Sequence, residues 1–372
     1  MRGSSAVVGC CSCRCDLLVG GVQYTLWYPV SPRTPLDNFS YLNGNSVGNL
    51  AAAAIRASAP DAYRTGAIGS TDLGDWQGDT ASGGRLPALV VFAHGLDAFP
   101  YIASELCERL VQTGRYIVAA PTLSTDEDLG ARLAAVSATI DNCMAMHGGH
   151  RLDPANIAMV GHSRGGCAAA VLALTDRRVC CAVCLSSNAG DTRSLLPRAP
   201  RAATTERTER DKPPALLTIH AADGRGETIM PAEWAELLAE VAPHTTAHMH
   251  ALVVRPAPHD WGTSLYTELS FKMPPWLQSV LRGLSSHVAV LQEIFPDGLV
   301  QSRAQELVGL AVEATTEFID GAMEAAAGAE PTRGNGASKL HAKAEGWLGR
   351  FEAEAERRQR LGLWRLTPRA RL

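Results

Sequence analysis

Between residues 88 and 254, short apolar runs alternate with segments of helical periodicity, and this alternation limits the fold more than any other feature. Ala88–Ala93 (ALVVFA) is apolar throughout, as is typical of a strand buried on both faces of a parallel sheet. The segment that follows carries Ile102, Leu106 and Leu110 at a spacing of four residues, which indicates a helix. The chain is therefore expected to contain an α/β domain.

The alternation continues beyond this first pair of elements. It requires right-handed crossovers, which place helices on both faces of a mostly parallel sheet. An earlier run that is rich in aromatic and β-branched residues, 22–28, predicts one more strand. The remaining strands are predicted at 116–120, 156–160, 179–186, 215–220 and 251–254, and the helices at 129–146, 165–174 and 231–241.

Outside this pattern, the chain divides into pieces of different character. Residues 1–20 are rich in cysteine and are expected to be disordered. The α/β domain is assigned to residues 21–265, and 31–84 is expected to be an irregular insertion within it. Residues 266–372 are predicted to form a C-terminal helical extension. Its two apolar stripes lie at 299–323 and 340–358.

The most specific local motif is Gly161-His162-Ser163-Arg164-Gly165-Gly166, which fits the pattern Gly-x-Ser-x-Gly. A predicted strand ends directly before the motif, and a helix rich in Ala, Val and Leu begins directly after it. The glycines permit a sharp turn between strand and helix, and such a turn exposes the serine hydroxyl above the sheet. Ser163 is therefore predicted to be a nucleophile.

A serine nucleophile needs a histidine that removes its proton, and the histidine needs a carboxylate that orients it. Asp223 follows the strand predicted at 215–220, and His259 follows the strand predicted at 251–254. The order Ser, Asp, His, with each residue in the loop after a strand, matches this type of hydrolase. We predict a triad of Ser163, Asp223 and His259 that requires no cofactor.

Other residues compete for the acid and base roles. Asp191 follows an earlier strand and is the alternative acid, whereas Asp260 adjoins the predicted base and is expected to point away from it. His244, His248 and His250 fall before or inside the last strand and not in the loop after it, which favours surface or core positions for them. The last two would share one face of a strand, but no carboxylate or cysteine at matching spacing accompanies them, so no metal site is predicted.

The negative charge that develops on the substrate carbonyl needs hydrogen-bond donors, usually two backbone N–H groups. Arg164, the residue after the nucleophile, is expected to supply one of them. The other is expected from the loop after Ala88–Ala93, where Gly95 permits a turn that presents the N–H of Leu96. Leu96 and Arg164 are therefore the predicted oxyanion hole.

Charge and hydropathy exclude several classes of partner. The chain has 372 residues and a net charge of −4, so it lacks the basic field that recruits nucleic acid or an anionic membrane. No apolar stretch approaches the roughly 20 residues of a transmembrane helix. The first residues also lack the features of a secretory signal. A cytoplasmic protein that acts on a small-molecule ester is expected.

The residues quoted above resemble those of the α/β-hydrolase superfamily, over about residues 22–262. The sequence Gly-His-Ser-Arg-Gly-Gly is particularly similar to that of chlorophyllases. Within the superfamily, the chain is similar to the dienelactone hydrolase, platelet-activating-factor acetylhydrolase, chlorophyllase and cutinase-like esterase group. The segments that carry this likeness are Leu26-Trp27-Tyr28-Pro29, Val91-Phe92-Ala93-His94-Gly95, the Ser163 motif and the loops of Asp223 and His259.

Two departures limit this likeness. Chlorophyllases and the acetylhydrolases tend to carry their acid just after the strand that follows the nucleophile helix, where this chain has Leu185-Ser186-Ser187. Dienelactone hydrolases have a cysteine at the position of Ser163. The resemblance implies a serine esterase and leaves its substrate open.

Together, the motif, the triad and the resemblance predict a serine hydrolase that cleaves a carboxylic ester through an acyl-enzyme intermediate. One alternative is an acyltransferase that uses the same triad. Another is a hydrolase fold without catalysis that serves as a binding or scaffold protein.

Residues 339–372 carry nine Lys and Arg against four Asp and Glu, so the C-terminal helix is a candidate surface for docking of a partner. The alternative role for this helix is packing on the core through Trp347, Leu348 and Phe351.

Overall fold

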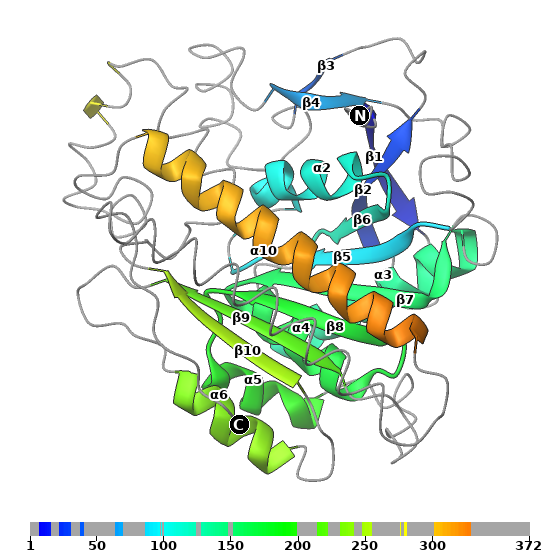
Figure 1. Cartoon of the computed structure of the whole chain (residues 1–372). Coiled ribbons are helices and arrows are strands. Elements are labelled where there is room, and N and C mark those ends of the chain that lie inside the picture. The colour runs from blue at the N-terminus through cyan, green and yellow to red at the C-terminus, as the bar shows by residue number, and fades with distance from the viewer. Residues whose placement is uncertain are drawn as a thin grey trace.

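The computed structural model describes residues 7–15, 22–30, 38–40, 64–69, 86–96, 98, 100–123, 128–147, 152–198, 214–221, 231–241, 248–254, 276, 279–280 and 301–328. Within these ranges the strands join in a single sheet (Figure 1). In chain order they are β1 (Val7–Cys15), β2 (Val22–Val30), β3 (Asn38–Ser40), β4 (Arg64–Gly69), β5 (Ala88–Ala93), β6 (Tyr116–Pro121), β7 (Asp153–His162), β8 (Val179–Leu185), β9 (Ala215–Ala221) and β10 (His248–Val254).

The spatial order of the strands is β10-β9-β8-β7-β5-β6-β2-β1-β4-β3. The six strands from β10 to β6 run parallel to one another, and β5 pairs with both β6 and β7. β2 adds to β6 in the antiparallel direction, and β1 adds to β2 in the same way. The predicted, mostly parallel sheet is confirmed. All six residues of β5 are buried, which explains its unbroken apolar sequence.

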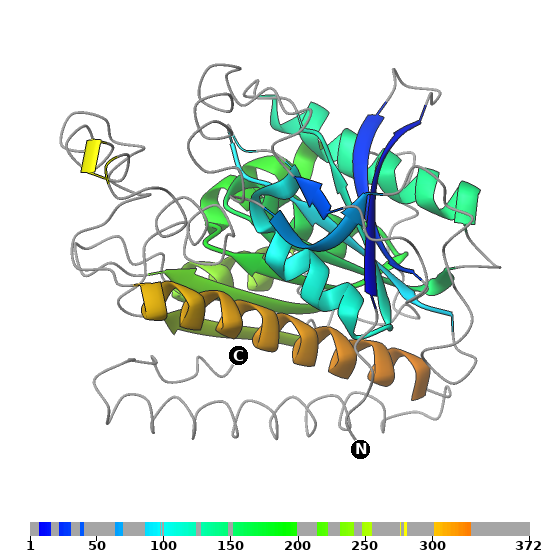
Figure 2. The same ribbon diagram turned by 90° about the horizontal axis from the view of Figure 1, so that it is seen from above.

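Helices cover both faces of the sheet (Figures 1 and 2). α2 (Ser104–Gln112) and α10 (Gln301–Gly328) share one apolar core with Val90, Phe92 and Val118 of the sheet. The second core, which contains Leu89 and Val91, lies on the opposite face. Four helices contribute to it: α3 (Leu129–His147), α4 (Arg164–Thr175), α5 (Ala189–Leu195) and α6 (Pro231–Val241). No helix in the described part of the chain has the length and apolar character needed to cross a membrane.

The C-terminal helix predicted within residues 266–372 is present as α10, and it packs on the α/β sheet as one of its helical layers. The apolar stripe predicted for this helix, Leu307 to Phe318, is buried against β8 and α2. Near its end, Asp320 accepts hydrogen bonds from the Arg115 side chain and the Tyr116 hydroxyl at the start of β6. The sequence predicts the helix and its buried side correctly, but only the structure shows what that side covers.

The disorder expected for residues 1–20 does not hold for β1, which pairs with β2 from Val7 opposite Val30 to Cys15 opposite Val22. A strand such as β2 has N–H and C=O groups along its free edge, and a second strand satisfies them. β4 pairs with β1, and β3 pairs with β4, so two strands from within the expected insertion 31–84 extend the sheet further. The helix predicted at 340–358 lies outside the described residues.

Candidate active site

Ser163 lies in the turn between β7 and α4, with φ of 54° and ψ of −125°. A non-glycine residue in such a conformation is strained by about 1–3 kcal/mol. Its N–H donates to the carbonyl oxygen of Leu185 at 2.8 Å, and its carbonyl accepts from the N–H groups of Gly166 at 2.9 Å and Cys167 at 3.2 Å. These bonds hold the strained turn between β8 and the first turn of α4. The predicted sequence of strand, sharp turn and helix is confirmed.

Two glycines allow the backbone of this turn to pass very close to its neighbours. A Cβ atom on Gly165 would lie 2.0 Å from the carbonyl oxygen of Ala93, and one on Gly161 would lie 2.2 Å from the carbonyl oxygen of Gly165. No side chain can be accommodated at such distances. α4 therefore packs directly on the ends of β5 and β7, as expected for the Gly-x-Ser-x-Gly motif.

The Ser163 side chain is half-buried, and its hydroxyl makes no capping hydrogen bond to α4, although Ser163 is the N-cap residue. A serine at this position ordinarily accepts a hydrogen bond from an N–H group in the first helical turn. The hydroxyl is thus not engaged in stabilising the helix. Its position at the end of β7 also places it at the carboxyl edge of the parallel strands.

Cys167 lies one turn further along α4, and its thiol donates to the carbonyl oxygens of Ser163 at 3.6 Å and Asn188 at 3.5 Å. Burial raises the pKa of this thiol to about 11. A thiol is a strong nucleophile only as a thiolate. Cys167 is therefore protonated near pH 7, and it does not replace Ser163 as the nucleophile of this site.

The segments that carry both predicted oxyanion donors meet at Ser163. A Cβ atom on Gly95 would lie only 3.1 Å from the Cβ of Ser163, and Leu96 follows in the same turn. Arg164 is the first residue of α4, so its N–H has no acceptor within the helix. The site thus brings the loop after β5 and the N-terminus of α4 to the same serine.

A buried arginine and a buried histidine support the loop after β5. Arg132 of α3 is 2% exposed, and its Nη2 donates to the carbonyl oxygens of His94 at 2.7 Å and Gly95 at 2.8 Å. The Nδ1 of His94 also contacts the Gly95 oxygen at 2.9 Å, and its Nε2 accepts from the N–H of Leu123 at 3.1 Å. Only the neutral tautomer with the proton on Nδ1 satisfies both contacts.

The charge state of His94 agrees with this geometry. Burial lowers the pKa of His94 to about 3, and the nearby positive charge of Arg132 contributes in the same direction. The ring is therefore neutral near pH 7. Sequence reasoning missed Arg132. The signal that could have found it is a charged residue four positions before Val136, on the side of α3 that is otherwise apolar.

The alternative acid, Asp191, has a clear structural role. It lies in the first turn of α5, where Asn188 is the N-cap residue. The N–H of Asp191 donates to Oδ1 of Asn188 at 2.6 Å, and Nδ2 of Asn188 donates to Oδ2 of Asp191 at 3.0 Å. This reciprocal pair acts as a cap at the start of the helix. Asp223 and Asp260 lie outside the described residues.

The structure separates two of the rival histidines from the carboxyl edge of the sheet. β10 ends at Val254, and His248 and His250 are its first and third residues. At about 3.3 Å per residue, they lie roughly 13–20 Å before the end of the strand. They are therefore too far along β10 to remove a proton from Ser163. His259 and His244 lie outside the described residues.

The same edge of the sheet contains further buried polar groups that sequence reasoning did not single out. Ser186, directly after β8, has φ of 49°, and its N–H donates to the carbonyl oxygen of Ile219 at 2.8 Å. His220, near the end of β9, is completely buried, and burial lowers its pKa to about 4. His162 is buried at the end of β7. The strained backbone of Ser186 and the buried, neutral His220 thus lie at the same edge of the sheet as Ser163.

Three solved enzyme structures are similar to this chain. A ferulic acid esterase from Streptomyces cinnamoneus matches over 86% of this chain and 90% of its own chain, with 17% sequence identity and a TM-score of 0.50. A dienelactone hydrolase from Anabaena variabilis matches over 76% of this chain and 98% of its own chain, with 14% identity and a TM-score of 0.40. One of two fungal esterases from Rhizomucor miehei matches over 77% of this chain and 84% of its own chain, with 12% identity and a TM-score of 0.42.

No curated protein sequence matches this chain. Family membership instead follows from a sequence model of a whole family, described as "Alpha/beta hydrolase family", which matches residues 90–310. This match covers more than half of the chain and includes most of β5, the Ser163 turn and most of the parallel sheet. It agrees with the strand order and with the helices on both faces. The chain belongs to the alpha/beta hydrolase family.

Proposed function

We propose that this protein is a serine hydrolase that cleaves carboxylic esters of small molecules. The observation that carries the proposal is the turn at Ser163. Its strained backbone holds a serine at the carboxyl edge of the sheet, the hydroxyl does not cap the helix, and the loop of Gly95 lies directly against it. The ferulic acid esterase from Streptomyces cinnamoneus, which has a similar fold, supports the choice of ester bonds as the reaction class.

In the proposed reaction, the Oγ of Ser163 attacks the ester carbonyl while His259 accepts its proton and Asp223 orients the imidazole. The N–H groups of Leu96 and Arg164 bind the oxygen of the tetrahedral intermediate. His259 then protonates the departing alcohol, which leaves an acyl group on Ser163. Water, deprotonated by the same histidine, hydrolyses this acyl-enzyme and regenerates the free serine.

The ends of two strands support the choice of acid and base. β9 ends at Ala221 and β10 ends at Val254, and both run parallel to β7, which leads into Ser163. Asp223 and His259 follow these strand ends by two and five residues. The capping role of Asp191 favours Asp223 further, because the Asp191 carboxylate is already bonded to Asn188.

Labelling with a fluorophosphonate probe tests the proposal. The probe phosphonylates an activated serine, so wild-type protein is expected to react and Ser163→Ala is expected not to react. Ser194→Ala, which alters an exposed serine of α5, is the matched control and should be labelled like wild type. Failure of the folded wild-type protein to react, or labelling of Ser163→Ala, would contradict the proposal.

Hydrolysis of a panel of short- and long-chain p-nitrophenyl esters tests the acid assignment and defines the acyl preference. Asp223→Asn is expected to lower kcat by about 10⁴-fold, because the histidine then adopts the wrong tautomer. Asp191→Asn should lower stability through loss of a helix cap and change kcat little. A larger loss of kcat in Asp191→Asn than in Asp223→Asn would reverse the assignment.

A further inference from the structure

We propose that Arg132 is a positioning residue of the oxyanion hole. In this proposal, which rests on the proposed function above, Arg132 fixes the peptide unit between Gly95 and Leu96 so that the Leu96 N–H faces the reacting carbonyl. Arg132 itself does not touch the substrate. It acts through the backbone of the loop after β5, to which its guanidinium is hydrogen-bonded.

The argument begins with the geometry of one peptide unit. The carbonyl of Gly95 and the N–H of Leu96 belong to the same planar trans peptide, so they point in opposite directions. Fixing the direction of the carbonyl therefore fixes the direction of the N–H. The Gly95 oxygen accepts hydrogen bonds from Nη2 of Arg132 at 2.8 Å and from Nδ1 of His94 at 2.9 Å. Rotation of this peptide would break both bonds.

Such a restraint is needed because residue 95 is a glycine. Glycine is favoured at this position, since a Cβ atom there would lie 3.1 Å from the Cβ of Ser163 and 3.4 Å from Nδ1 of His162, which is tighter than most side-chain contacts. Glycine also gives the backbone more conformational freedom than any other residue. The close approach to Ser163 thus creates a flexible point at the donor loop, and the bonds to the Gly95 oxygen remove that flexibility.

Arg132 is well suited to this role because of its burial and its two acceptors. At 2% exposure its charge is shielded from water, so its hydrogen bonds are stronger than those of a neutral donor. The same Nη2 reaches the consecutive carbonyl oxygens of His94 and Gly95. A single nitrogen atom therefore restrains two successive peptide units of the loop. It also polarises the Gly95–Leu96 peptide, which increases the positive charge on the N–H that would face the oxyanion.

The test compares Arg132→Met, which removes the donors, with Arg132→Lys, which keeps the charge but not the planar fork. Loss of a whole oxyanion donor lowers kcat by about 10²–10³-fold. Arg132→Met leaves the donor present but less well oriented, so kcat on a p-nitrophenyl ester is expected to fall by about 10–100-fold with little change in KM. Arg132→Lys should lie between this variant and wild type.

A pair of inhibitors separates positioning from general damage to the site. A trifluoromethyl ketone forms an anionic tetrahedral adduct with the nucleophilic serine, whereas the corresponding trifluoromethyl alcohol has the same skeleton and forms no adduct. Arg132→Met should weaken binding of the ketone by the same factor as it lowers kcat/KM, and leave binding of the alcohol unchanged. Arg178→Met, a variant at the opposite edge of the sheet, is the matched control and should bind both compounds like wild type.

The outcomes distinguish this inference from the proposed function. If wild-type protein neither hydrolyses the ester nor forms the ketone adduct, the proposed function fails. If wild type does both, and Arg132→Met retains kcat/KM and ketone affinity within twofold, the positioning role is overturned. Equal weakening of ketone and alcohol also overturns it. Should Arg132→Met fail to fold, the same comparison in Arg132→Lys decides the question, with a loss of at least threefold in ketone affinity alone expected.

Discussion

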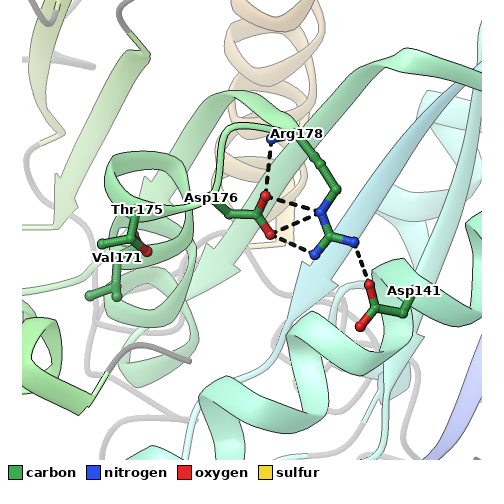
Figure 3. Close-up of polar contacts among 5 residues, drawn as sticks. All are labelled: Asp141, Val171, Thr175, Asp176 and Arg178. Carbon is green, nitrogen blue, oxygen red and sulfur yellow. Dashed lines mark hydrogen bonds and ion pairs between the residues drawn. The ribbon is translucent and has the colours of Figure 1, made fainter. Parts of the chain in front are cut away.

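Arg178 and Arg132 lie toward opposite edges of the same sheet and bind different kinds of partner. Arg178, at the amino edge where β8 begins, donates from Nε and Nη2 to the carboxylate of Asp176, at 2.6–3.1 Å, and also pairs with Asp141 of α3 (Figure 3). Arg132, beside the carboxyl edge where β5 ends, donates to backbone carbonyl oxygens. Arg178 links the start of β8 to α3, whereas Arg132 holds the loop after β5 in one conformation.

The two edges of the sheet also differ in backbone conformation. Among the described residues, the non-glycine residues with positive φ are Ser163 and Ser186, and both follow strands at the carboxyl edge. The buried, neutral side chains of His94 and His220 lie there too. The amino edge instead pairs Asp176, 1% exposed, with a guanidinium. At the carboxyl edge, strained backbone and buried neutral histidines position the loops at a cost in stability. At the amino edge, the ion pair serves stability alone.

A new side chain at the carboxyl edge is expected to have the largest effect. In Gly165→Ala the added Cβ would lie 2.0 Å from a backbone oxygen that cannot move without displacing β5. The free energy of unfolding should fall by about 4 kcal/mol or more, as measured by urea denaturation. Gly321→Ala in α10, where a Cβ meets no atom within 4 Å, is the control and should be neutral or stabilising by less than about 1 kcal/mol. A Gly165→Ala protein of normal stability would refute the close packing.

At the amino edge, a smaller effect confined to stability is expected. Arg178→Met leaves the buried Asp176 carboxylate without its guanidinium, although the backbone N–H of residue 178 still donates to it at 3.0 Å. Urea denaturation should show a loss of about 2–3 kcal/mol, and kcat/KM of the folded protein should stay within twofold of wild type. Arg109→Met, which removes an exposed pair with Glu105, should cost less than about 0.5 kcal/mol. A change in kcat beyond twofold in Arg178→Met would show that the two edges are not independent.

The smallest expected effect is a pH dependence that originates at the carboxyl edge. The pKa values of His94 and His220 are lowered to about 3 and about 4 from an ordinary value of 6.5. As pH falls below 6.5, the unfolded chain therefore takes up protons that the folded protein does not. Each histidine should lower the free energy of unfolding by up to about 1.4 kcal/mol per pH unit between pH 6 and 5, with no contribution above pH 7.

His220→Leu is the variant that isolates this effect. In the described structure neither ring nitrogen of His220 has a hydrogen-bond partner, so replacement by leucine removes the titrating group without removing a bond. Urea denaturation at pH 7.5, 6.0 and 5.0 should give a shallower decline in stability for the variant, by up to about 1.4 kcal/mol per pH unit between pH 6.0 and 5.0. An unchanged decline would mean that His220 does not stay neutral in the folded protein.

The elements that the sequence predicts correctly are those with a strong local signal. β5, β6 and β8 are short apolar runs buried on both faces, and the turn at Ser163 is encoded within six consecutive residues. In both cases the physical cause lies within a short stretch of chain. The positions of Leu96 and Arg164 beside Ser163 follow from the same local signal, since each is adjacent to a recognisable turn, and their role as oxyanion donors stays a prediction.

The features that the sequence does not predict depend on contacts between distant segments. Arg132 binds carbonyl oxygens 37 and 38 residues away, and nothing around it in the sequence indicates that partner. β1 becomes a strand because β2 presents a free edge, not because its cysteine-rich sequence alternates. Asp191 is a plausible triad acid by position alone, and only its bonds to Asn188 show its role as a helix cap.

The place of α10 in the fold also bears on how the protein is made. Its contact with β6 joins Tyr116 to Asp320 across 204 residues of chain. Among the described helices, α2 covers part of this face early in synthesis, whereas the part along β8, which carries Val183, is covered by α10 and stays exposed until α10 has emerged from the ribosome. The nascent chain must therefore carry a large uncovered apolar surface for much of its synthesis, which makes docking of α10 a late folding step and this surface a natural target for chaperones.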